Sequence, residues 1–393
     1  MEIIEELTRI QMDLVRWVPT DYVRDYMDEI NWNLPLVGIV GARGVGKTVL
    51  VLQRVKLLGR SPDETLYVSA DNPLVLRAGL YSIGSMFFRY GGKEIIIDEV
   101  HKYPDWATEV KALHDSNPDR KIVVLGSSRL AVLTQKGDLS RRMMIYEMAP
   151  LSFREYLNLR YSVQLGKFSI SEILENHQKI ANEILKVFPE VLKAFKEFMT
   201  FGNFPYFSVF KRKSEYLEIL RSVLDKVFYE DIPSVKFMKP PTIASLKKLL
   251  AFVAESPTPQ ISVTSLTKDI GISRDTFYDV LDILEGSCVI RLVRKKGRIK
   301  GGKIFLFTCD MYSAVAGERN VNVGTLREAF FVSQLYGKRI EVPEDGEDDF
   351  VVDGIRYEIG GKSKRKGTTV VLKDDLDIGF KNSIPLYLMG FVR

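Results

Sequence analysis

An apolar segment that runs straight into a glycine-rich turn and then into a helix is the feature that most constrains this fold. LPLVGIV (34–40) precedes the turn GARGVGKT (41–48), and TVLVLQRVKLL continues with a helical pattern. Strands that alternate with helices are typical of a parallel sheet covered on both faces. We therefore predict a parallel three-layer α/β domain over residues 1–150, with an N-terminal helix. Its further strands are expected at residues 65–70, 94–100, 121–128 and 142–148.

The glycine-rich turn matches the pattern G-x-x-x-x-G-K-[ST] in full. Its glycines allow the backbone to wrap closely and to direct N–H groups at phosphate oxygens. Lys47 offers a positive charge to the β and γ phosphates, and Thr48 offers a hydroxyl to Mg²⁺. A chance glycine turn is the alternative, but the strand before it and the helix after it stand where a P-loop NTPase needs them. We predict that ATP is bound by Gly41, Ala42, Arg43, Gly44, Val45, Gly46, Lys47 and Thr48.

Two carboxylates follow three consecutive isoleucines in the segment EIIIDEV (94–100). An apolar run of this kind predicts a buried strand, and a buried strand has no favourable place for paired charge. Beside a phosphate loop, Asp98 is expected to hold the magnesium ion and Glu99 to activate the attacking water. A solvated strand end is the alternative, but it would not require this apolar run before two adjacent acids.

Other candidates depend on weaker patterns. Ser127 and Ser128 end the segment KIVVLGSS and would lie near the γ-phosphate, unless they only turn the chain. Asp71, after another strand, would line the same cleft. Arg142, or its neighbour Arg141, is a candidate arginine finger for a neighbouring subunit's γ-phosphate, and a surface arginine is the alternative.

The chain changes character after Pro150. A helical pattern runs to the proline pair at 240–241, which marks a boundary. Residues 241–303 have the order of a winged helix, with helical patterns followed by two strands around KKGR, and short strands fill residues 304–393. We predict a helical lid (151–240), a winged helix (241–303) and a small C-terminal α/β domain (304–393). The pair DG at residues 353–354 predicts a tight hairpin turn.

Four segments in order, GARGVGKT, DEVHKYPDW, LGSS and PLSFREYL, resemble a prokaryotic family of AAA+-type ATPases with a C-terminal region of unknown function. The resemblance continues through FGNFPYF and the later segments, so it covers nearly the whole chain. It implies that Lys47 and Thr48 bind nucleotide and magnesium, that Asp98 binds the metal and that Glu99 activates water. It also aligns Arg142 with an arginine of the family.

One departure concerns the strand before LGSS. The family usually has Thr or Ser where this chain has Leu125. The resemblance therefore leaves Ser127 as the candidate that senses the γ-phosphate.

The C-terminal region of this family resembles PD-(D/E)xK nucleases. The matching acids are Glu328, Asp349 and Glu358, but the catalytic lysine expected two residues after Glu358 is Gly360. The nearest lysine is Lys362. We predict a restriction-endonuclease-like fold that is degenerate and lacks nuclease activity.

Charge in the predicted winged helix is unevenly distributed. The outward face of SRDTFYDVLDILEG carries four acids and one arginine, which would repel phosphates in a major groove. The predicted wing, Arg291 to Lys303, carries seven Lys and Arg in thirteen residues. We predict that it contacts the backbone of double-stranded DNA without reading sequence. A solvated hairpin tip and a protein interface are the alternatives.

Composition excludes several classes of protein. The 393 residues carry a net charge of +5, and the two cysteines have no CxxC spacing, so a disulfide framework or a structural zinc site is not expected. Three scattered histidines argue against a histidine-based metal centre. The N-terminus is acidic and amphipathic, and no apolar run approaches the length of a membrane span. We expect a cytoplasmic protein without a membrane segment.

Together these patterns predict Mg²⁺-dependent ATP hydrolysis coupled to conformational change, acting on or near DNA. One alternative is an ATP-gated, metal-dependent nuclease. Another is a slowly hydrolysing regulatory switch that binds a protein partner. No N-K-x-D motif for guanine is found. The partner, the specificity for DNA and the oligomeric state stay open, although an arginine finger in trans would require a homo-oligomer.

Overall fold

A computed structural model describes residues 2–127, 139, 141–210, 212–235, 238, 240–257, 260–360 and 369–393. Ser128 and Lys362 therefore lie outside the described residues. The chain divides into two compact units, each discontinuous in sequence. Unit 1 comprises Met1–Ala149 and Glu230–Phe237, and unit 2 comprises Pro150–Tyr229 and Met238–Arg393.

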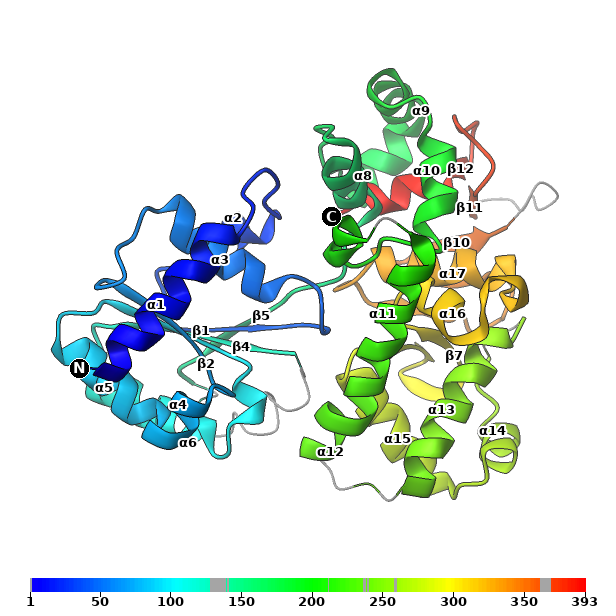
Figure 1. Ribbon diagram of the computed structural model, residues 1–393. Coiled ribbons are helices and arrows are strands. Elements are labelled where there is room, and N and C mark those ends of the chain that lie inside the picture. The colour runs from blue at the N-terminus through cyan, green and yellow to red at the C-terminus, as the bar shows by residue number, and fades with distance from the viewer. Residues whose placement is uncertain are drawn as a thin grey trace. The chain divides into compact units, whose positions relative to one another are not determined.

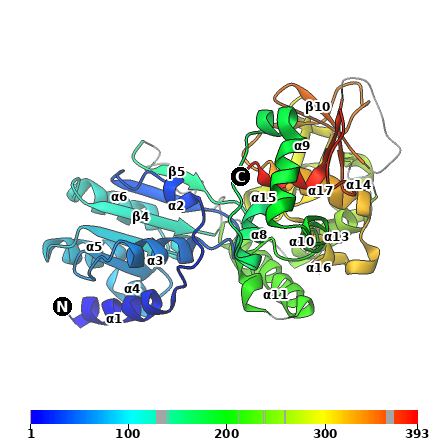
Figure 2. The same cartoon turned by 90° about the horizontal axis from the view of Figure 1, so that it is seen from above.

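Unit 1 is built on a parallel sheet with the order β2-β3-β4-β1-β5 among the described residues. Every residue of β1 and β3 is buried, so helices cover both faces of the sheet (Figures 1 and 2). This confirms the predicted P-loop α/β fold. Strand β4 lies between β1 and β3, which places the strand that precedes the glycine loop and the strand that ends in acids two positions apart. The strands are β1 (Leu36–Val40), β2 (Thr65–Ser69), β3 (Glu94–Asp98), β4 (Lys121–Gly126) and β5 (Met144–Glu147).

The helices of unit 1 follow the strands in the expected alternation. Helix α1 packs against β2 and α3, and α5 packs against α6. A buried ion pair ties α3 to β3, because Arg54 donates to both carboxylate oxygens of Glu94 at 3.0 and 2.8 Å. The helical elements are α1 (Glu2–Trp17), α2 (Tyr26–Glu29), α3 (Lys47–Leu57), α4 (Pro73–Ala78), α5 (Leu80–Arg89), the 3₁₀ turn η1 (Val100–Lys102), α6 (Trp106–Ser116) and α12 (Ile232–Val235).

Unit 2 begins with helices, as its sequence pattern predicts. Helix α8 starts with a capping box in which the Ser152 side chain and the Glu155 side chain each bond the other's backbone N–H. The helical elements that precede the sheet are α8 (Phe153–Tyr161), α9 (Ile170–Val187), α10 (Val191–Phe198), η3 (Pro205–Val209), α11 (Lys213–Lys226), α13 (Pro240–Glu255), α14 (Val263–Ile270) and α15 (Arg274–Gly286). The π-helical turn η4 (Val227–Asp231) follows α11 and carries the chain from unit 2 into unit 1. The later ones are α16 (Cys309–Ala316), η5 (Glu318–Asn320), α17 (Val323–Gln334) and η6 (Leu386–Phe391).

The described strands of unit 2 form one sheet with the order β12-β11-β10-β9-β8-β6-β7. Hairpin β6–β7 is the predicted wing, and β6 pairs in parallel with β8 through Arg294 and Glu341. The hairpin and the C-terminal strands therefore share a sheet. Helices α13 to α15 and this hairpin have the predicted order, while the assignments as winged helix and nuclease-like domain stay predictions. The strands are β6 (Ile290–Lys295), β7 (Arg298–Leu306), β8 (Ile340–Glu341), β9 (Phe350–Val352), β10 (Ile355–Ile359), β11 (Val370–Lys373) and β12 (Ser383–Pro385).

The predicted tight turn at residues 353–354 is confirmed. Asp353 and Gly354 have φ values of 50° and 81°, and Val352 pairs with Ile355 across the hairpin. Positive φ at both central residues is the requirement of a type I′ turn.

Among the described residues, every helix is too short or too polar to cross a membrane.

Candidate nucleotide-binding site

The glycine loop connects the carboxyl end of β1 to the first turn of α3. A Cβ atom on Gly41 would lie 2.2 Å from the carbonyl oxygen of Met148, so only glycine fits there. Gly44 and Gly46 have φ values of 88° and 97°, which side chains disfavour. The loop conformation thus depends on the glycines that define its pattern.

Lys47 is buried within this loop. Its Nζ donates to the carbonyl oxygens of Gly41 and Ala42, at 2.9 and 3.2 Å. The side chain is only 7% exposed. The loop therefore holds a positive charge against its own backbone, close to the N–H groups at the start of α3, where anions are favoured.

Thr48, in the first turn of α3, lies against Asp98, the last residue of β3. Thr48 Oγ1 donates to Asp98 Oδ2 at 2.5 Å, and the Tyr67 hydroxyl donates to the same oxygen at 3.0 Å. Burial, with the charge of Asp98, raises the pKa of Tyr67 far above its usual value, so the phenol stays a neutral donor.

A magnesium ion fits these residues. Mg²⁺ prefers oxygen ligands and usually keeps several waters, binding one or two carboxylates and the phosphates of a substrate. Asp98 supplies a buried carboxylate and Thr48 an adjacent hydroxyl. In the described part of the chain, no group of three or more His, Cys, Asp or Glu side chains is placed to hold a metal. The site would thus depend on the nucleotide for part of its ligands.

The backbone turns away from the direction of β3 at Glu99. Its backbone is left-handed, with φ 51° and ψ 34°, an uncommon conformation for a residue other than glycine. This turn points the two acidic side chains in different directions. Asp98 is buried, whereas the Glu99 side chain is 26% exposed. Adjacent carboxylates thereby occupy different environments, one beside Thr48 and one beside His101.

A cluster of polar side chains lies next to Glu99. His101 Nε2 lies 3.3 Å from Glu99 Oε2 and 3.1 Å from Ser127 Oγ. Asp231 approaches the same histidine nitrogen to 3.6 Å, and Arg43 of the glycine loop donates to Asp231 at 3.2 Å. Burial disfavours the charged form of Asp231, but His101 and Arg43 outweigh it and lower the pKa of this carboxyl.

The structure gathers most of the predicted site residues at one edge of the sheet. The eight loop residues, Asp98, Glu99 and Ser127 all lie at or directly after the carboxyl ends of β1, β3 and β4. Asp71 follows β2 and pairs with Lys102 at 2.8 Å. Parallel strands bring these ends together, as the alternation of strands and helices predicts.

Arg142 lies elsewhere in unit 1. It precedes Met144, which pairs with Val37 near the amino end of β1, so it belongs to the opposite edge of the sheet. Its guanidinium donates to both oxygens of Asp115, at 2.8 and 3.2 Å. Arg142 therefore does not reach the glycine loop of its own unit.

Sequence reasoning missed His101 and Asp231. His101 lies on the turn directly after the acid pair, and its position three residues beyond Asp98 is the one signal that could have drawn attention to it. Asp231 lies 104 residues beyond Ser127, and no local pattern links it to the site.

The acids of the predicted nuclease-like domain surround a lysine. Lys303 Nζ, on β7, donates to Glu328 Oε2 at 2.7 Å and to Asp349 Oδ1 at 3.2 Å. Its side chain is 9% exposed. One of the seven basic residues of the predicted wing is thus buried among acids.

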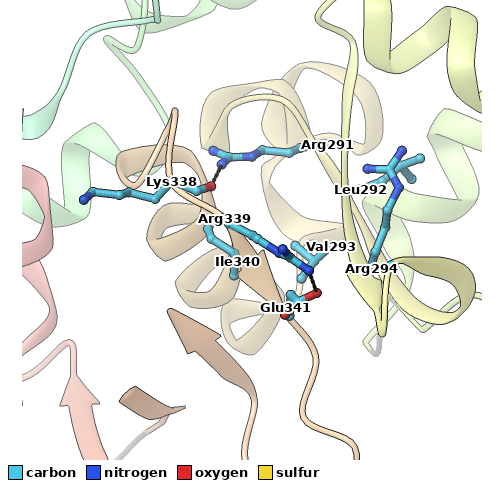
Figure 3. A pocket seen from close by; sticks show the side chains of 9 residues that line it. Arg291, Leu292, Val293, Arg294, Lys338, Arg339, Ile340 and Glu341 are labelled. Atoms are coloured by element: carbon cyan, nitrogen blue, oxygen red, sulfur yellow. Dashed lines mark hydrogen bonds and ion pairs between the residues drawn. The ribbon is translucent and has the colours of Figure 1, made fainter. Parts of the chain in front are cut away.

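A separate pocket lies in unit 2 between β6 and β8, with a volume of about 320 Å³ (Figure 3). Its basic residues are already engaged. Arg291 donates to the Lys338 carbonyl at 3.4 Å, Arg294 pairs with Glu285 at 2.7 Å, and Arg339 pairs with Glu341 at 2.8 Å. The pocket is lined by Arg291, Leu292, Val293, Arg294, Gly297, Lys338, Arg339, Ile340 and Glu341.

Residues 33–157 match a family described as an AAA domain. This match supports an AAA+-type P-loop ATPase, and the matched segment includes the glycine loop, Asp98 and Glu99. Residues 192–301 match a second family, described as a domain of unknown function.

Two relatives come from Methanocaldococcus jannaschii. The uncharacterized protein MJ1637 is 27% identical over 72% of this chain, and the uncharacterized protein MJ1544 is 24% identical over 65%. The chain spans 60% and 55% of the length of these relatives.

Solved structures include the Walker-type ATPase PABY2304 of Pyrococcus abyssi, with 11% identity, a TM-score of 0.44 and coverage of 74% of this chain and 93% of that one. The ORC1 protein of Aeropyrum pernix, solved in complex with DNA, has 13% identity and a TM-score of 0.31, with coverage of 79% and 92%. Both scores are below 0.5, so the domain assignment rests on the sequence match.

Proposed function

We propose that unit 1 binds ATP with Mg²⁺ and hydrolyses it to ADP and phosphate. The observation that carries this proposal is the meeting of Thr48, Asp98 and the buried Lys47 within the segment that matches an AAA domain. The loop N–H groups and Lys47 bind the phosphates, with phosphate oxygens replacing the carbonyls that Lys47 now contacts. Bound Mg²⁺, held by Asp98 and Thr48, would neutralise charge that develops on the phosphates.

Glu99 is the residue that we assign to water activation. It lies beside Asp98 and its side chain is 26% exposed, so in this proposal its carboxylate accepts the proton of a water that attacks the γ-phosphate. A role for Arg142 as an arginine finger requires a second copy of the chain, because Arg142 lies at the opposite edge of the sheet. We propose a homo-oligomer only because an arginine finger at Arg142 would need a neighbouring copy of the chain.

We propose further that hydrolysis is coupled to conformational change. The segment Glu230–Phe237 belongs to unit 1, whereas the residues on either side of it, Tyr229 and Met238, belong to unit 2. A displacement of this segment at the nucleotide site is therefore transmitted along the chain at both of its ends. This supports a switch or motor in which nucleotide binding and hydrolysis change how unit 2 interacts with a binding partner.

The function is tested by steady-state ATP hydrolysis with Mg²⁺ and by nucleotide binding. We expect Glu99→Gln to lower kcat by about 10²- to 10⁴-fold, the usual contribution of a general base, while retaining affinity for ATP. Lys47→Ala, as the matched loop variant, should lose binding as well as turnover. Wild-type turnover in Glu99→Gln would contradict the assignment. Tight binding with negligible turnover in the wild type would instead favour the slow regulatory switch.

For DNA, we propose backbone contact by the β6–β7 hairpin turn. Arg294, Lys296 and Lys303 pair with Glu285, Glu344 and Glu328. Arg291 donates to the backbone carbonyls of Val332, Leu335 and Lys338. Among the described residues, no ion pair is seen for the other basic side chains of the hairpin, which are Lys295, Arg298 and Lys300.

A metal-dependent nuclease is the less favoured function. Its metal would have to bind where the Lys303 ammonium already contacts Glu328 and Asp349. The position expected for the catalytic lysine is Gly360.

A further inference from the structure

His101 faces more acceptors than it has protons to donate. Its side chain is 1% exposed, and Nε2 lies within 3.6 Å of oxygens of Glu99, Ser127 and Asp231. A lone pair on Nε2 would face two carboxylates, so Nε2 carries a proton in this arrangement. One N–H cannot serve all three oxygens, and its direction decides which acid it stabilises.

The hydrogen bonds favour Ser127 over Glu99. Nε2 and Ser127 Oγ form a hydrogen bond of 3.1 Å, and the Ser127 hydroxyl donates to Asp231 Oδ2 at 3.5 Å. Glu99 Oε2 lies 3.3 Å from Nε2 but is not aligned for a hydrogen bond, and it has no hydrogen-bond partner within the described residues. A relay from His101 through Ser127 to Asp231 therefore leaves this Glu99 oxygen uncommitted.

Asp231 is fixed in place by the glycine loop. Its carboxylate is buried and accepts from Arg43 at 3.2 Å, so it contacts the loop as well as the relay. Because a negative acceptor orients the Ser127 hydroxyl toward itself, the serine lone pair stays available to His101. Without Asp231, that hydroxyl is free to turn, and Glu99 is the nearest remaining charged acceptor for the imidazole N–H.

Building on the hydrolysis proposed above, we propose that Asp231 is a positioning residue that keeps Glu99 active by drawing the His101 N–H toward Ser127. When Asp231 withdraws, the His101 N–H bonds the buried Oε2 of Glu99 and makes this carboxylate a weaker acceptor for the water's proton. Asp231 belongs to the segment Glu230–Phe237, whose ends continue into unit 2. Movement in unit 2 thereby controls hydrolysis through one carboxylate.

The test compares kcat, KM and nucleotide affinity in the full-length chain. Asp231→Ala should lower kcat by about 10- to 100-fold, the effect of one new hydrogen bond to a charged group. The KM for ATP should change much less. Adding His101→Ala to Asp231→Ala should raise kcat to that of His101→Ala alone, because no N–H is left to hold Glu99. His101→Leu repeats the experiment with a larger side chain if the alanine variant unfolds.

Glu230→Ala is the matched control. Glu230 lies on the same segment and its carboxylate approaches Arg43 to 3.7 Å, but this ion pair does not involve His101. Its kcat should stay near that of the wild type. A double variant as slow as Asp231→Ala, or an Asp231→Ala variant with full kcat, would overturn the relay.

An NMR readout separates this inference from the proposed function. The chain has three histidines, so the imidazole ¹⁵N resonances are few. The His101 Nε2–H signal should shift in Asp231→Ala toward a stronger hydrogen bond, and this change should disappear in Asp231→Ala/Glu99→Gln. No shift would overturn the relay. A wild type without turnover would overturn the hydrolytic function itself, and control of hydrolysis with it.

Discussion

Asp310 shows how a buried charge is accommodated in unit 2. It is fully buried at the start of α16, and its carboxylate accepts from Asn203 N at 3.0 Å, from Thr308 Oγ1 at 2.6 Å and from the Tyr216 hydroxyl. Burial raises the pKa of Asp310, although these donors oppose the shift. The carboxylate links the start of α16 to Asn203 and Tyr216, which are distant from it in sequence.

Replacing Asp310 by Asn should destabilise unit 2. The amide NH₂ would face groups that already donate, so at least one buried donor loses its acceptor, at a cost of about 1–3 kcal/mol. Urea unfolding at pH 7 would measure the loss. Asp225→Asn is the control, since its ion pair with Lys247 is exposed and worth at most about 1 kcal/mol. Equal effects of the two changes would contradict this account.

At the scale of single residues, the sequence pattern identified those whose role follows from local spacing. The loop glycines, Lys47, Asp98 and Glu99 belong to short motifs attached to strand ends, and the structure brings them together. His101 and Asp231 escaped prediction because their role depends on a contact with Ser127 across the fold. Lys303 escaped for the same reason, since its spacing is typical of an exposed hairpin.

Among the elements, hairpin β6–β7 carries the clearest test. Each phosphate neutralised by a lysine or arginine lowers the slope of log K against log salt by about 0.9. With Lys295, Arg298 and Lys300 as the contacts, the slope should be about −2.7. Replacing all three by alanine should abolish binding of double-stranded DNA, measured by fluorescence anisotropy at several salt concentrations.

The control for the hairpin is Lys296→Ala, because Lys296 is paired with Glu344 at 2.7 Å. It should weaken DNA binding far less than the triple change. A slope near −6, or undiminished binding by the triple variant, would show that the ion pairs open and that the whole basic segment contacts DNA.

The strands and helices of unit 1 could be predicted because their hydrophobic periodicity and the residues that end them are local features of the sequence. The strands are apolar runs, and glycine, proline or acidic residues end several of them. The joining of β6 to β8 was not predictable, because one pair of residues, Arg294 and Glu341, connects segments 47 positions apart. Short strands such as β8 carry too few residues to show a period.

For the whole molecule, the division into two units predicts how nucleotide stabilises the chain. Ligand that binds only the folded site adds about 2.7 kcal/mol at a concentration of 100 Kd. In Glu99→Gln with Mg²⁺ and ATP, amides in the core strands of unit 1 should exchange about 100-fold more slowly. Amides in α16 and α17 should change much less. Hydrogen exchange with mass spectrometry would check this, and equal protection of both units would contradict it.

By itself, the sequence determined the parallel α/β fold of unit 1, its glycine loop and the acid pair, because these follow from hydrophobic period and from motifs of a few residues. Only the tertiary structure decided that the segment Glu230–Phe237 belongs to unit 1, that Asp231 meets His101 there, and that Lys303 lies among the acids of unit 2. Contacts of this kind join residues far apart in the chain. Their formation depends on how whole elements pack, which no local pattern encodes.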